Sequence, residues 1–118
     1  MPYQLGDTYH GDGFWTSGSI LTNPTANTII VDTGALSAGR YLFAISGESD
    51  VAWVYDIQHR NAANSANVSA QRRRPASGSE DFLFPNKITI AANERVRILL
   101  TTGVTGEIQA CIFYLEVP

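Results

Sequence analysis

Few residues in this chain of 118 have types and spacings that could do chemistry. His10 lies between Asp7 and Asp12, and an imidazole together with carboxylates can bind a divalent metal ion. The spacing of these three side chains matches no compact metal-ligand motif, and the neighbouring glycines indicate a loop. We therefore expect no metal site, and the sequence predicts no cofactor-binding residue.

A second combination is that of a nucleophile and a base. Cys111 is the only cysteine, which excludes a disulfide within the chain, and His59 is the other histidine. Cys111 lies within the apolar run from Ala110 to Leu115, where the surroundings disfavour a thiolate. We expect Cys111 to be a buried small side chain rather than a nucleophile.

Two pairs of carboxylates, Glu48 with Asp50 and Glu80 with Asp81, have the residue types of a glycosidase acid and base. Both pairs fall in predicted turns beside strands, where acidic residues are common. The chain contains no Gly-x-Ser-x-Gly, phosphate-loop or dinucleotide-binding pattern. No catalytic residue is predicted, and we do not expect an enzyme.

Basic charge is concentrated in one segment. Residues 60–78 contain four arginines and no acidic residue, whereas the flanking parts carry charges of −5 and −2, for a net charge of −3. We expect a long loop with at most one helical turn, in which Arg72, Arg73 and Arg74 could grip carboxylates or phosphates. Two interpretations of this segment remain open. It is either a solvated loop or a contact with an acidic protein surface, including the acidic surface of a neighbouring copy. Nucleic-acid binding is less favoured, because the segment has no aromatic residue to stack on bases.

Residues 1–17 differ in composition from the rest of the chain. They combine glycines with large aromatic side chains, among them Tyr3, Tyr9, Phe14 and Trp15. Such a segment cannot form its own core, so we expect an extended N-terminal arm that covers either this domain or a partner. These aromatics and the three arginines above are the predicted partner-binding residues.

The last predicted strand is apolar on both faces. One face carries Ile108, Ala110, Ile112 and Tyr114, and the other carries Cys111, Phe113, Leu115 and Val117. The second face is explained either by the N-terminal arm lying over it or by a self-interface at Phe113, Leu115 and Val117. Both explanations remain open.

The elements that must position these residues are strands, because apolar side chains alternate with period two and turn residues recur at short intervals. One wall of the core is expected from the alternating side chains of two neighbouring strands, namely Tyr41, Phe43 and Ile45 with Val51, Trp53, Tyr55 and Ile57. Two hairpins are expected, and Pro85 should mark a sheet edge or a break in a strand. We predict an all-β fold, a two-sheet antiparallel sandwich of jelly-roll type with seven or eight strands, over residues 18–118 as a single domain. The expected strands are Gly18–Thr22, Asn27–Asp32, Gly39–Ser46 paired with Val51–His59, Asp81–Ala91, and Glu94–Thr102 paired with Glu107–Val117.

The overall composition narrows the class of protein. Hydrophobic residues make up 44% of the chain and charged residues 16%, so a disordered chain is excluded and a surface covered by partners is favoured. The longest apolar run has six residues, whereas a membrane-spanning helix needs about 20, so no membrane span is expected. The first residues lack the pattern of a secretory signal. The negative net charge argues against a surface built for nucleic acid.

Three stretches carry a resemblance to a known class of proteins: Thr33–Phe43, Gln58–Val68 and Ala92–Arg97. In their general pattern, residues 33–117 resemble the small β-sandwich virion proteins of tailed bacteriophages, in particular capsid decoration or cement proteins. The pattern Gly39-x-Tyr41-x-Phe43 is also similar to the trimeric jelly rolls of the tumour-necrosis-factor and complement C1q type.

The resemblance implies a structural virion protein that binds the outside of a phage head, assembled in the host cytoplasm. The implied partners are the major capsid protein and two further copies of the chain in a homotrimer, with no membrane contact and no direct binding of nucleic acid. The alternative is a fibre or tail module that recognises a host glycan or receptor through exposed aromatic side chains.

Overall fold

The computed structural model describes residues 13–118, which form ten β-strands and, within that range, no helix. No helix of the described residues is therefore long and apolar enough to span a membrane. The strands are β1 (Phe14–Ser17), β2 (Leu21–Thr22), β3 (Ile29–Asp32), β4 (Gly39–Ser49), β5 (Tyr55–Arg60), β6 (Asn67–Arg73), β7 (Gly78–Leu83), β8 (Ile88–Ile90), β9 (Arg95–Leu100) and β10 (Glu107–Val117).

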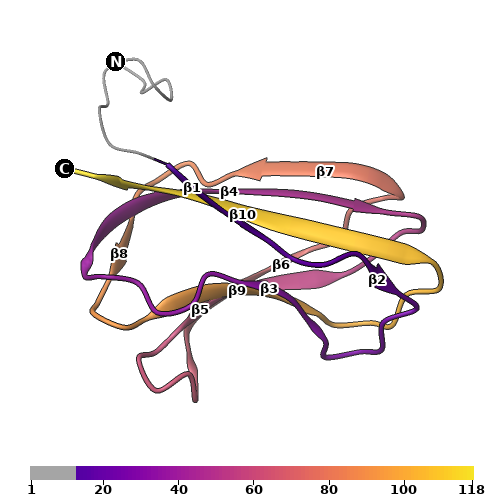
Figure 1. The fold of residues 1–118 in the computed structure, drawn as a ribbon, viewed down its shortest axis with the longest axis horizontal. Helices are drawn as coiled ribbons and strands as arrows, with labels where there is room; N and C mark the ends of the chain where they lie inside the picture. Colours follow the sequence, from indigo (N-terminus) through magenta and orange to yellow (C-terminus); the bar gives the residue numbers. More distant parts are fainter. Residues whose placement is uncertain (1–12) are drawn as a thin grey trace.

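The strands form two antiparallel sheets that face each other (Figure 1). The six-stranded sheet has the order β1-β10-β4-β7, with β2 also paired to β10 and β8 also paired to β4. The four-stranded sheet has the order β3-β9-β5-β6. The prediction of an all-β sandwich of two antiparallel sheets is confirmed.

Both edges of the six-stranded sheet are interrupted. Gly18 separates β1 from the stretch that leads to β2, and its backbone N–H donates to the carbonyl of Ala110 at 2.9 Å. A Cβ at this position would overlap the backbone carbonyl of Ile30, so only glycine allows the close approach. On the opposite edge, Pro85 lies between β7 and β8, which confirms the predicted break.

The two predicted hairpins are wrong, although the strands exist. β4 pairs with β10, β7 and β8 in one sheet, whereas β5 pairs with β6 and β9 in the other. β9 and β10 are likewise in different sheets. The alternation of apolar side chains shows which face of a strand is buried. It does not show the strand's partner, because two strands that pack face to face across the core have the same alternation as two strands paired in one sheet. Of the described strands, only β5 and β6 are both consecutive in sequence and paired with each other.

The long loop predicted for residues 60–78 is also wrong, because β6 occupies its centre. The strand was missed because every side chain from Asn67 to Arg72 is exposed, so the sequence there has no apolar alternation. The connection between β5 and β6 is short and extends away from the body of the sandwich (Figure 1). In this connection Asn64 has a positive φ of 54°, which asparagine tolerates better than most residues.

The core lies between the sheets and is built from the inward side chains of the long strands. It includes Tyr41, Phe43 and Ile45 of β4, together with Trp53, Tyr55 and Ile57, as predicted. Val51 was expected in the same core, but it precedes β5 and is 38% exposed. The largest side chains with almost no exposed surface are Tyr55, Phe43, Ile45, Ile90, Ile98, Leu100, Ile108, Ile112 and Val96. This continuous core holds the outer faces of the two sheets as rigid surfaces.

Candidate binding surfaces

The outer face of the six-stranded sheet carries an apolar row that crosses four strands. Trp15 of β1 is in register with Phe113 of β10, which is in register with Ala44 of β4, and Ala44 is in register with Leu83 of β7. The ring centroids of Trp15 and Phe113 are 5.1 Å apart. Both ends of the row, Trp15 and Leu83, are 64% exposed. A hollow beside the row is lined by Trp15, Ala44, Ile45, Ser46, Asp81, Phe82 and Leu83.

The neighbouring row on the same face is polar. It consists of Ser17, Cys111, Ser46 and Asp81. Cys111 is half-buried rather than buried, and its Sγ lies 3.4 Å from the Oγ of Ser17. His59 is on a buried face of the other sheet, so the structure does not bring Cys111 and His59 together.

Phe14 connects the surface of the same sheet to the core. Its ring is exposed and stacks on Tyr114 with centroids 5.6 Å apart. Tyr114 in turn contacts Tyr41 and Phe43. Phe14 and Trp15 were assigned to the N-terminal arm, but they belong to β1 and are held in the sheet by β10. The predicted contact residues Tyr3 and Tyr9 lie outside the described residues, as do the candidate metal ligands at positions 7, 10 and 12.

The residues of the predicted self-interface are less accessible than expected. Leu115 and Val117 are only 3% and 5% exposed, and Phe113 is half-buried beside Trp15. The strongly exposed side chains of the apolar row are therefore Trp15 and Leu83 rather than the residues of the predicted self-interface. The self-interface at Phe113, Leu115 and Val117 stays a prediction.

The predicted trio of arginines does not act as a unit. Arg72 forms a two-pronged ion pair with Asp56, with Nε 2.8 Å from Oδ1 and a terminal nitrogen 3.2 Å from Oδ2. This partner raises the pKa of Arg72. Arg73 turns to the other face of β6, where it pairs with Glu80. Arg74 is exposed, and no ion pair joins it to the described residues. Two of the three charges are therefore matched within the chain.

The carboxylate of Glu80 is the centre of a buried polar group. It accepts hydrogen bonds from the hydroxyl of Tyr55 at 3.2 Å and from Nε of Arg73 at 3.2 Å. The guanidinium of Arg73 also lies 4.1 Å from the ring centroid of Phe82. Burial and the nearby Glu80 raise the pKa of Tyr55. Asp81 faces outward from the same strand, so Glu80 and Asp81 do not form a catalytic carboxylate pair.

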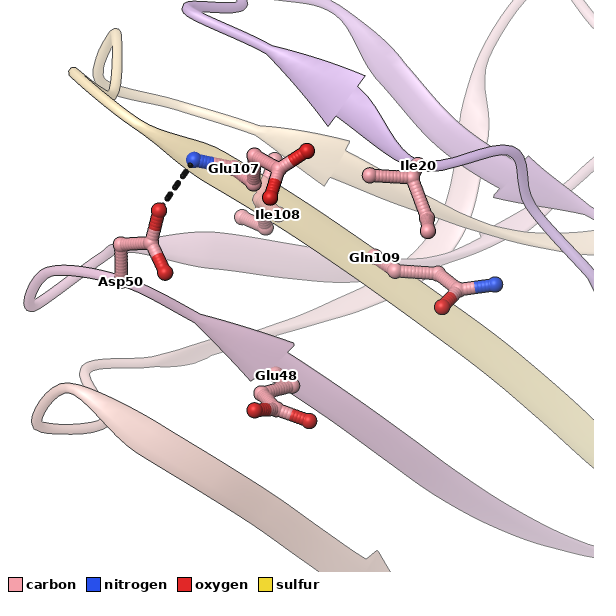
Figure 2. Close-up of a pocket in the computed structure, with 6 residues that line it drawn as sticks. All are labelled: Ile20, Glu48, Asp50, Glu107, Ile108 and Gln109. Carbon is pink, nitrogen blue, oxygen red and sulfur yellow. Dashed lines mark hydrogen bonds between the residues drawn. The ribbon is translucent and has the colours of Figure 1, made fainter.

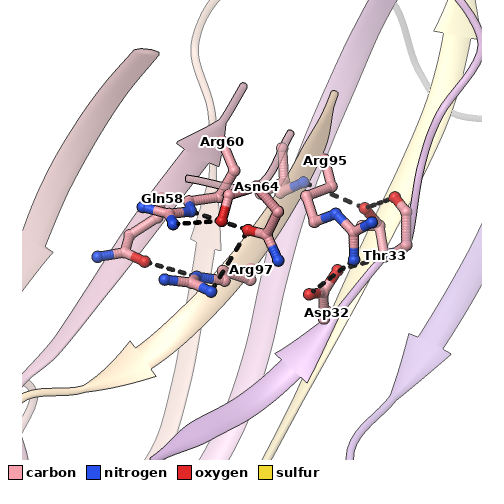
Figure 3. Close-up of polar contacts among 9 residues, drawn as sticks. Asp32, Thr33, Gln58, Arg60, Asn64, Arg95 and Arg97 are labelled. Carbon is pink, nitrogen blue, oxygen red and sulfur yellow. Dashed lines mark hydrogen bonds and ion pairs between the residues drawn. The ribbon is translucent and has the colours of Figure 1, made fainter. Parts of the chain in front are cut away.

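A second group of arginines, which sequence reasoning missed, lies on the outer face of the four-stranded sheet (Figure 3). Arg60 of β5 is in register with Arg95 of β9, and Arg97 is in register with Gln58. Nε of Arg97 donates to Gln58 at 2.7 Å. The side-chain oxygen Oδ1 of Asn64 accepts one hydrogen bond from Nε of Arg60 at 2.9 Å and another from a terminal nitrogen of Arg97 at 3.5 Å. These amide groups hold the guanidinium groups in fixed orientations.

The arginine group carries excess positive charge, because among residues 13–118 its only ion pair joins Arg95 to Asp32, at 3.4 Å. Burial, then Arg60 and Arg95, lower the pKa of Arg97, while Asp32 acts in the opposite direction. Such a surface favours carboxylate or phosphate oxygens. The alternation of Arg95 and Arg97 with apolar residues indicates that these two share a face, but only strand pairing adds Arg60.

Acidic side chains gather at one end of the six-stranded sheet, where a hollow is lined by Ile20, Glu48, Asp50, Glu107, Ile108 and Gln109 (Figure 2). Oδ2 of Asp50 accepts a hydrogen bond from the backbone N–H of Glu107 at 2.8 Å. Asp50 thus joins the end of β4 to the start of β10 and has a structural role. Within residues 13–118, no three potential ligands come together to hold a metal ion.

His59 also has a structural environment. Its Nε2 lies 2.8 Å from Oε1 of Glu94, which accepts a further hydrogen bond from the backbone N–H of Ala91 at 2.8 Å. The Ala91 hydrogen bond, followed by His59, lowers the pKa of Glu94. No nucleophilic side chain is hydrogen-bonded to His59 among the described residues.

No protein-family model matches this chain, and no curated protein matches its sequence.

Proposed function

We propose that this protein is a structural virion component of the capsid decoration type, which binds the outer surface of a phage head. Its proposed partner is the major capsid protein, and the proposed location is the virion. The observation that carries the proposal is the exposed apolar row on the outer face of the six-stranded sheet, with Trp15 and Leu83 at its ends. An exposed row of this kind on a rigid sheet is typical of a contact surface for another protein.

The strand order supports the finer assignment of a jelly roll. When β1 with β2 and β7 with β8 are each counted as one interrupted strand, ten strands become eight, four in each sheet. Most of the chain then alternates between the sheets from one strand to the next. Eight-stranded double-sheet jelly rolls of this kind occur in viral capsid and lectin domains.

The proposed mechanism requires no chemical step. A protein that binds the assembled lattice, and not its separated subunits, stabilises the lattice by mass action. Many copies bound to neighbouring subunits add their effects, so the affinity of each contact can be modest. In this mechanism the homotrimer implied by the sequence resemblance would place three apolar rows on one site of the lattice.

The test is co-sedimentation of the full chain with empty phage heads assembled from the proposed partner, the major capsid protein. Trp15→Ser and Leu83→Ser remove the two exposed ends of the row without touching the core. We expect the double variant to bind at least about 30-fold more weakly, since buried aromatic anchors at interfaces contribute about 2 kcal/mol or more.

The matched control is Ile29→Ser, which changes an exposed apolar residue in β3 of the four-stranded sheet. It should bind heads as the unchanged chain does. Equal binding by the double variant and the control contradicts the role given to the row, and no binding by the unchanged chain contradicts the proposed function.

One observation favours the alternative, a module that recognises a host glycan. The hollow beside Trp15 places an exposed indole next to the polar side chains of Ser46 and Asp81, and binding sites often combine an apolar surface with a few polar groups. A glycan array read by fluorescence distinguishes the two functions. Specific sugar binding that Trp15→Ser abolishes, without binding to heads, supports the module.

A further inference from the structure

Three of the four sheet edges carry features that hinder pairing with another strand. One edge of the six-stranded sheet is divided into β1 and β2, which have four and two residues. The other edge is broken at Pro85, and the charged side chain of Glu80 points inward from it. In the four-stranded sheet, β3 has four residues and a bulge between Ile29 and Val31.

β6 is the fourth edge, and it lacks these features. It is seven residues long, contains no proline, and pairs only with β5, so its outer edge has no strand partner in residues 13–118. Its register with β5 is regular from Arg73 back to Ser69 and shifts only near the connecting turn. Side chains from Asn67 to Arg72 are exposed, and the first five residues of the strand carry no charge. A long exposed edge of this kind is a template for strand pairing.

We propose that the outer edge of β6 pairs with β6 of a second copy in antiparallel orientation, which joins two four-stranded sheets into one continuous sheet. The placement of charge supports this choice of partner. Arg72 and Arg73 lie at one end of the strand, so a parallel copy would set like charges side by side. An antiparallel copy sets the arginines of each strand against the uncharged half of the other. The contact is symmetric and closes as a dimer.

The length of β6 indicates the register. Full overlap of residues 67–73 in two antiparallel copies places Ala70 opposite the same residue of the second copy and Arg72 opposite Val68. Directly opposed residues in an antiparallel pair have Cα atoms about 4.5–5.5 Å apart, which is within the range of a disulfide. A cysteine near the centre of the strand should therefore cross-link the dimer.

The first experiment is cysteine substitution at Ser69, Ala70 and Gln71, one at a time, in a chain that also carries Cys111→Ser. We expect mild oxidation to give a covalent dimer from at least one of the three. The control is Ala76→Cys, because Ala76 is also exposed but lies in the connection between β6 and β7. Absence of a cross-link from all three positions overturns the proposal.

The second experiment measures the solution mass of the full chain by light scattering over a range of concentrations. Ala70→Lys places two ammonium groups opposite each other, and we expect it to raise the dimer dissociation constant by about tenfold or more. Ala76→Lys adds the same charge outside the strand and should change the constant little. Circular dichroism checks that both variants keep the fold, since both positions are exposed.

The outcomes also separate this contact from the proposed function. The β6 contact is overturned if the unchanged chain is a monomer in solution. It is also overturned if the chain is a trimer and the cysteine variants form no cross-link. A dimer, or a hexamer in which β6 joins two trimers, supports it when the cross-link forms. Binding to phage heads is tested through Trp15 and Leu83 on the other sheet, so either proposal can fail without the other.

Discussion

Replacing Glu80 by glutamine tests whether the buried polar group of Tyr55, Glu80 and Arg73 stabilises the fold. Glu80 is 8% exposed, and it holds the edge strand β7 to β6 and β5 of the opposite sheet. Glutamine keeps the size of the side chain and can still accept from the Tyr55 hydroxyl. The substitution therefore removes mainly the charge that matches Arg73.

The expected loss follows from the burial of the pair. Opposite charges about 4 Å apart near a protein surface attract by about 4 kcal/mol, but removing them from water offsets much of this gain. The side chain of Arg73 is 31% exposed, so water can partly solvate it after the carboxylate is lost. We expect Glu80→Gln to lower the free energy of unfolding by about 1–2 kcal/mol. For a chain of this size that is a fall in Tm of about 4–8 °C.

The assay is urea unfolding followed by circular dichroism, with Arg73→Met and the double variant completing a mutant cycle. Methionine keeps an apolar stem over the ring of Phe82. Asp56→Asn serves as the control, because it breaks the ion pair of Arg72, whose side chain is 50% exposed, and should cost less than about 0.5 kcal/mol. If Glu80→Gln costs no more than the control, or if the cycle shows no coupling, the reasoning is refuted.

Three further predictions concern the core and the titrating groups. Ile98→Ala should cost about 2–5 kcal/mol in urea unfolding, because Ile98 has no exposed surface in the core. The pKa of Glu94 is lower in the folded protein than in the unfolded chain, so the ionised carboxylate stabilises the fold. This stabilisation should be lost as the pH falls from the pKa of the unfolded state through that of the folded state, and Glu94→Gln should weaken the dependence of the unfolding free energy on pH in this range. The pKa values of Tyr41 and Tyr55 are raised, so ultraviolet titration should show both ionising above pH 10 in the native protein and near 10 in denaturant.

Much of the local structure could be predicted from the sequence. The alternation of Tyr41, Phe43 and Ile45 correctly predicted a core-facing strand, and the place of Pro85 correctly predicted a break. β6 could not be found in this way, because a strand exposed on both faces has no apolar period. Arg72 and Arg73 were therefore assigned to a loop, although they lie on opposite faces of a strand.

The candidate surfaces were predictable only in part. Trp15 was singled out by its residue type, and it is exposed, but its neighbour across the sheet is Phe113 because of the register between β1 and β10. The arginine group of the other sheet joins Arg60 to two residues more than thirty positions later in the sequence. Residue types indicated which side chains could bind, but they did not indicate which would be neighbours.

The sequence by itself determined the all-β class, the core-facing side of β4 and the break at Pro85, because side-chain period and turn residues act over a few positions. Only the tertiary structure decided that β4 and β5, and likewise β9 and β10, lie in opposite sheets. Burial of an apolar face is satisfied equally well by a neighbour in the same sheet and by a strand across the core. The choice between them depends on how all the strands pack together, and that packing determines which side chains lie side by side on the two outer faces.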